Sequence, residues 1–154
     1  MTDAGFELVL HDPQQAGVFF VGEGDIATLE TGARDAGLLV RRIDLHGCTG
    51  KDALLQRIAD ALSTPEGQGR NWDALSDQLR DLSWLPARGY ALLLPHAAGL
   101  RDAEEACFDT LLDILDDATI DWQERDVPFW AFLALPDDEF PDATAGDEGL
   151  PSTR

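Results

Sequence analysis

The sequence predicts an α/β domain in which a three-stranded parallel sheet is packed by helices. Three apolar runs of strand length are separated by segments whose apolar residues recur at helical spacing. Strands that alternate with helices pair in parallel through right-handed crossovers. The chain has 154 residues, 44% of them hydrophobic, which is enough for one domain with a buried core.

Residues 1–37 are predicted to add a further strand and a short helix at one edge of this domain. The run Gly17-Val-Phe-Phe-Val21 has the β-branched and aromatic composition of a strand. Asp25 is placed to cap a helix that ends before Gly37. No residue pattern in this segment indicates chemistry.

Residues 38–135 form the predicted domain itself. Its strands are expected at 38–45, 88–94 and 127–135, and the second is apolar enough to be buried on both faces. Its helices are expected at 51–62 (capped by Thr49), 71–82 and 100–122. The tail, 136–154, is rich in Asp, Pro, Gly, Ser and Thr and is predicted to be disordered, because it can bury little apolar area.

The charge of the chain argues against two classes of partner. There are 30 acidic and 11 basic residues, a formal net charge of −19, and the six acids and one Arg of the tail account for −5. The remaining −14 belongs to residues 1–135. Nucleic acid and anionic membrane surfaces repel such a protein, so a basic protein partner is expected instead. No apolar run approaches the roughly 18 residues that span a bilayer.

The composition gives no sign of secretion, of a metal or of a cofactor. The opening residues lack the basic and then apolar pattern of a secretory signal, so a cytoplasmic location is expected. Cys48 and Cys107 fit neither a metal nor a redox spacing, and two reduced thiols are predicted.

The three histidines are scattered and predict no ligand cluster: His11, His46 and His96. There is no Gly-rich phosphate loop, and no cofactor is predicted.

The stretch 65–84 carries the strongest functional pattern, a glycine-broken loop that leads into a helix. Asn71 is predicted as the N-cap, because its side-chain oxygen can accept a backbone N–H of the first turn. Apolar residues at helical spacing form the predicted buried face: Trp72, Leu75, Leu79 and Leu82. Three carboxylates recur every four residues on the remaining surface and are called the acidic stripe below: Asp73, Asp77 and Asp81.

The acidic stripe has an ordinary interpretation as a solvated helix face. Like charges four residues apart destabilise a helix by about 0.2–0.5 kcal/mol per pair. Arg70 and Arg80 lie three residues from Asp73 and Asp77, respectively, and are placed to offset part of this repulsion. The motif around the stripe favours a functional interpretation.

That motif resembles the barstar family, the intracellular inhibitors of secreted microbial ribonucleases. The resemblance is carried by Pro65-Glu66, Gly69 and Asn71-Trp-Asp-Ala-Leu-Ser-Asp77, with Ile43-Asp-Leu-His-Gly47 upstream and Tyr90-Ala-Leu-Leu-Leu94 downstream. It covers about residues 38–135. It implies the three-stranded parallel sheet of that family and a non-catalytic protein, not an enzyme, that binds a basic, extracellular-type ribonuclease.

By the same resemblance, the contacts to the ribonuclease come from this loop and helix and from an acid on the next long helix. The matching residues are Gly69, Asn71, Asp73, Asp77 and Asp117, with Asp113 or Asp116 as alternatives to the last. Helix-borne carboxylates can imitate RNA phosphates, accept charge-assisted bonds from Arg and plug the active site in a one-to-one complex. The free protein is expected to be a monomer.

Two alternatives remain open. The family pattern has aromatic side chains where this chain has Gly67, Gln68 and Ser76, and their loss removes apolar contact area. A barstar-like module for a different basic protein is therefore the second hypothesis. The third is a metal-dependent enzyme that holds Mg²⁺ or Ca²⁺ at Asp73 and Asp77, although no calcium loop or catalytic base accompanies them.

Overall fold

Four parallel strands form one sheet in the order β1-β4-β3-β2. The computed structural model describes residues 9–65 and 71–137, so Gly69 and the tail from residue 138 lie outside the described residues. The strands are β1 (Val18–Gly22), β2 (Leu39–Arg42), β3 (Tyr90–Leu94) and β4 (Phe129–Leu135). The helices are α1 (Ile26–Asp35), α2 (Lys51–Ala61), α3 (Trp72–Asp81), α4 (Ala98–Ala103) and α5 (Glu105–Glu124), with a 3₁₀ turn, η2, at Glu23–Asp25.

The α/β class and the parallel pairing agree with the prediction from the sequence. The N-terminal strand β1 lies at one edge of the sheet and pairs with β4 from Val18 opposite Ala131 to Gly22 opposite Leu135. The sheet is therefore continuous over four strands, and the N-terminal segment takes part in it directly.

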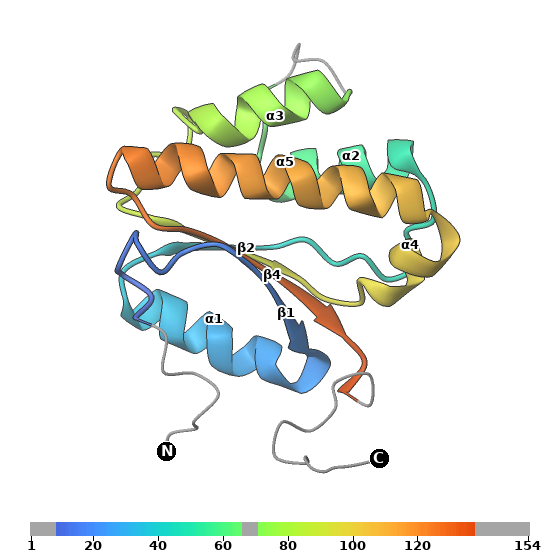
Figure 1. The fold of residues 1–154 in the computed structure, drawn as a ribbon, viewed down its shortest axis with the longest axis horizontal. Coiled ribbons are helices and arrows are strands. Elements are labelled where there is room, and N and C mark those ends of the chain that lie inside the picture. The colour runs from blue at the N-terminus through green and yellow to red at the C-terminus, as the bar shows by residue number, and fades with distance from the viewer. Residues whose placement is uncertain (1–8, 66–70, 138–154) are drawn as a thin grey trace.

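Helices cover both faces of the sheet (Figure 1). On one face, α1 packs Ile26, Leu29 and Ala33 into a cluster with the apolar side chains that β2, β3 and β4 direct to that side. On the other face, α2, α3 and α5 enclose the larger cluster. Every residue of β3 and β4 is buried, because parallel crossovers place helices on both sides of a central strand. The predicted two-sided burial of β3 is confirmed.

Two local predictions were wrong, and a third is correct only in the position of the residue. The single helix expected at 100–122 is divided into α4 and α5 at Glu104, whose φ of −141° and ψ of 71° are not helical. Gly50, not Thr49, is the N-cap of α2, and no side chain caps that helix. Asp25 is the N-cap residue of α1, as predicted, but its carboxylate makes no capping bond to that helix and instead accepts the backbone N–H of Gly22 at 3.2 Å, at the start of the 3₁₀ turn. Each depends on backbone angles that residue type alone does not specify.

None of the helices in the described part of the chain combines the length and the apolar character needed to cross a membrane.

Gly89 lies where β2, β3 and β4 begin, and its lack of a side chain is required there. A Cβ atom at this position would lie 2.5 Å from Leu38 Cδ2, 2.7 Å from Pro128 Cγ and 3.0 Å from the Pro128 carbonyl oxygen. We expect Gly89→Ala to lower the free energy of unfolding by about 1–3 kcal/mol through overpacking. Urea denaturation measures this change in the free energy of unfolding. Gly99→Ala in α4 is the matched control, since a Cβ there meets no atom within 4 Å, and an equal loss in both variants would contradict the explanation.

Candidate functional site

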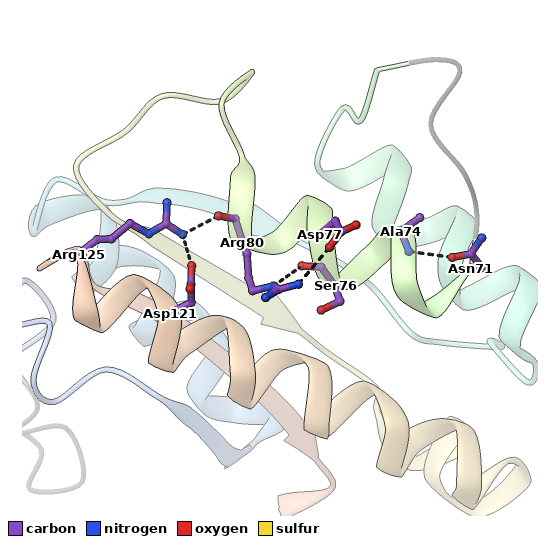
Figure 2. Close-up of polar contacts among 7 residues, drawn as sticks. All are labelled: Asn71, Ala74, Ser76, Asp77, Arg80, Asp121 and Arg125. Atoms are coloured by element: carbon purple, nitrogen blue, oxygen red, sulfur yellow. Dashed lines mark hydrogen bonds and ion pairs between the residues drawn. The ribbon is translucent and has the colours of Figure 1, made fainter.

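The N-terminus of α3 is built as predicted. Asn71 has extended backbone angles (φ −146°, ψ 176°), and its side-chain Oδ1 accepts the backbone N–H of Ala74 at 2.8 Å (Figure 2). This bond satisfies one of the N–H groups that a helix leaves without an internal partner. Asn71 therefore sets the point at which α3 starts, and with it the position of every carboxylate that follows.

The face of α3 that packs on the core differs in part from the prediction. Leu75, Leu79 and Leu82 are buried, as expected. Trp72 is only half-buried at the margin of the core, where the Lys51 ammonium lies 5.8 Å from its ring centroid. Gln78 is buried although it is polar, which hydrophobic periodicity did not predict.

The C-terminus of α3 is attached to α5 through two of its last carbonyl groups. The indole N–H of Trp122 donates to the Leu79 carbonyl at 2.7 Å. The guanidinium of Arg125 donates to the Arg80 carbonyl and to the Asp121 carboxylate (Figure 2), and it lies 3.7 Å above the ring of Trp122. These donors bind carbonyls that have no partner within the helix, and the cation is favourable at that end of the helix dipole. The C-terminal ends of α3 and α5 are thus held together.

The acidic stripe lies on the exposed side of α3, as predicted. Asp73, Asp77 and Asp81 are all exposed, and the side chain of Asp77 keeps 78% of its accessible surface. Asp77 Oδ1 forms an ion pair with Arg80 Nη2 at 3.0 Å. The stripe is therefore open to a partner, and one of its carboxylates already contacts a cation of its own helix.

Helical geometry separates Asp116 from the other two candidate acids on α5. Asp113, Asp116 and Asp117 are all exposed. Asp117 lies one turn before Asp121, whose carboxylate binds the arginine that contacts α3. Asp116 lies seven residues before Gln123, whose side chain reaches the opposite flank and donates to carbonyls of the N-terminal segment. The row of α5 that ends at Asp121 therefore carries Asp117, with Asp113 one turn before it, and not Asp116.

A second polar cluster, which the sequence did not predict, lies at the carboxyl edge of the sheet. His96 Nδ1 is 2.8 Å from Asp44 Oδ1, and the rings of His46 and His96 meet edge to face at 5.3 Å between centroids. The backbone N–H of His96, a residue with a φ of +62°, donates to the Glu23 carboxylate at 2.9 Å. The expectation that the histidines are scattered is wrong for this pair. Their common position directly after neighbouring parallel strands was the available signal.

Neither the acidic stripe nor this cluster is arranged as a metal site. Within residues 9–65 and 71–137, no group of three or more His, Cys, Asp or Glu side chains is placed to hold a metal ion. Cys48 and Cys107 are free thiols, and both are buried. Burial, with a smaller effect of Glu104 and of Cys48, raises the pKa of the Cys107 thiol, which disfavours the reactive thiolate.

Comparison with known proteins identifies a family. The profile of the family described as "Barstar (barnase inhibitor)" matches residues 38–134, which is more than half of the chain. Comparison with curated protein sequences finds no match. Among solved structures, a chain of "Structure of Drosophila ORC bound to DNA" is similar, with a TM-score of 0.49 and 16% sequence identity. The match covers 90% of this chain but 36% of that one, and a likeness of this degree carries no functional argument.

The Asn71 cap can be tested by two substitutions at one position. Asn71→Ala removes the acceptor for the Ala74 N–H, and we expect it to lower the free energy of unfolding by about 1 kcal/mol. Asn71→Asp keeps an acceptor of the same reach, so its stability should stay close to that of the unsubstituted protein. Urea denaturation measures both, and equal losses would show that the cap bond is not the cause.

The Asp44 carboxyl should make stability depend on acid pH. Burial alone raises the pKa of Asp44, but hydrogen bonds from the His46 N–H and the His96 ring outweigh it and hold that pKa below its usual range. The ionised Asp44 carboxylate therefore stabilises the folded protein at pH values above its unfolded-state pKa of about 3.9. This stabilisation is lost as the pH falls through the lower pKa of Asp44 in the folded protein. Asp44→Asn should therefore be less stable than the parent at pH 6, by an amount that shrinks towards pH 3. Asp35→Asn, at an exposed aspartate of α1, is the control, and a pH-independent difference would contradict this account.

Proposed function

This chain belongs to the Barstar family, and from that premise we propose that it is a non-catalytic inhibitor of a basic, barnase-type ribonuclease. The observation that carries the proposal is the acidic stripe of α3, exposed to solvent and held in place at both ends of the helix. The inhibitor acts by occlusion: α3 enters the active-site cleft and keeps RNA out of it.

The proposed contacts follow from the chemistry of a ribonuclease cleft, which binds phosphates through Lys, Arg and His. Asp73 and Asp77 take the place of phosphate groups, and an Arg of the partner can bind such a carboxylate through two parallel hydrogen bonds. Asp117 extends the negative surface from α3 onto the neighbouring flank of α5. Asn71 and Gly69 contribute from the start of α3 and from the loop before it.

Preorganisation is what favours tight binding here. A helix whose backbone is ordered before binding adds no backbone ordering cost to the cost of about 0.5–1.5 kcal/mol for each side chain immobilised in the complex. The Asn71 cap and the Trp122 and Arg125 bonds order the backbone of α3 in the free protein. The net charge of −14 on residues 1–135 also attracts a basic partner over distance and raises the association rate, an effect that salt screens.

A barstar-like binding module for another basic protein is the alternative function. Ser76, which lies between Asp73 and Asp77 on α3, is half-buried and offers little apolar area for an interface anchor. The carboxylates are therefore present without the aromatic side chains that the family pattern places beside them. Under either function we propose a cytoplasmic protein that is monomeric when free and binds its partner one-to-one.

The test is calorimetric titration of the full chain with a barnase-type ribonuclease at low and at moderate salt. One-to-one binding that weakens as salt is raised is the expected result, together with loss of ribonuclease activity at equal concentrations. Absence of binding at low salt would overturn the inhibitor proposal in favour of a different basic partner.

Asp77→Ala is the most informative single substitution for this proposal. Removing one member of a hydrogen-bonded charge pair that becomes buried in a complex lowers the binding free energy by about 2–5 kcal/mol. This range comes from charged protein interfaces in general, and complexes of this family are among them. We expect the affinity to fall accordingly, while circular dichroism and urea denaturation show a folded protein. Asp35→Ala, on α1 across the sheet, removes the same charge and should lower affinity only slightly. Equal losses in the two variants would show that net charge, not this carboxylate, drives binding.

A further inference from the structure

Arg80 is positioned so that its cation covers part of the acidic stripe. Its side chain runs back along α3 towards the N-terminus, as helix side chains do, and ends on Asp77 (Figure 2). Nη2 lies 3.0 Å from Asp77 Oδ1, and Nε donates to the Ser76 carbonyl at 3.2 Å. Because Arg125 also binds the Arg80 carbonyl, the backbone from which this side chain starts is fixed.

We propose that Arg80 is an internal competitor that lowers the affinity of Asp77 for cationic groups of the partner. The inference rests on the proposed function and adds a residue that determines its strength. A partner Arg that binds a carboxylate through both oxygens needs Asp77 Oδ1, which Arg80 occupies. A partner cation must therefore displace the guanidinium of Arg80 or accept one oxygen only, beside a like charge that repels it.

The exposure of the pair makes this exchange feasible. The side chain of Arg80 keeps 44% of its accessible surface and that of Asp77 keeps 78%, so the ion pair is solvated and weak. Arg80 can turn away without leaving a buried charge unpaired. The competition is therefore a modest adjustment of affinity and not a block on binding.

A purely structural role for Arg80 makes different predictions. If the residue only supports α3 through its pair with Asp77, its removal would lower the stability of the helix and leave binding unchanged or weaker. Competition requires the opposite effect on binding, and it requires that the effect depend on Asp77.

The test is a double-mutant cycle in which the chain is titrated with a barnase-type ribonuclease at low salt. The four proteins are the parent, Arg80→Gln, Asp77→Ala and the double variant. The matched control is Arg34→Gln, which removes the same charge and breaks an ion pair of 2.8 Å with Glu30 on α1. We expect Arg80→Gln to bind up to about fivefold more tightly than the parent, the upper range for one exposed ion pair, and more tightly than Arg34→Gln. In the Asp77→Ala background the gain should fall to that of the control.

The outcomes separate this inference from the proposed function. Equal affinity of Arg80→Gln and Arg34→Gln overturns the competition and leaves the inhibitor proposal intact, as does a gain that persists without Asp77. Absence of binding by every variant overturns both proposals.

Discussion

The side chain of Trp122 joins the core of the protein to the helix that carries the candidate site. Its ring packs inside the core against Tyr90 and Phe129, at centroid distances of 5.2 and 6.4 Å. Its indole N–H leaves that core and binds the Leu79 carbonyl of α3. A buried carbonyl without this donor would cost about 1–3 kcal/mol. The position of α3 relative to the sheet therefore depends on this one residue more than on any charge.

Burial of its inner face explains why α3 can carry a stripe of like charges. Repulsion between carboxylates four residues apart is worth about 0.2–0.5 kcal/mol per pair. Full burial of a leucine such as Leu75 or Leu79 contributes about 1.5–3 kcal/mol, several times more. Packing thus determines where α3 lies, and its outer surface is free to be acidic for the sake of a partner.

Two groups of carboxylates within the described residues differ in what they contact. Asp44 and Asp121 bind groups from other parts of the fold or from the end of their own helix, and they help to hold the sheet edge and the α3–α5 junction. Within residues 9–65 and 71–137, Asp77 contacts a solvated cation of its own helix, and that contact can be exchanged for one to a partner. The first group serves the fold, and the second is available for binding.

The amino-acid sequence by itself determined the elements that depend on near neighbours. The alternation of strands and helices, the Asn71 cap, the exposed stripe of α3 and the buried β3 were all predictable, because periodicity and capping act within a few residues. Only the tertiary structure decided the break at Glu104, the meeting of His46 with His96, and the contact of Arg125 with α3. These depend on strand order and helix packing, which bring together residues that are far apart in the chain, or on backbone angles that no local pattern specifies.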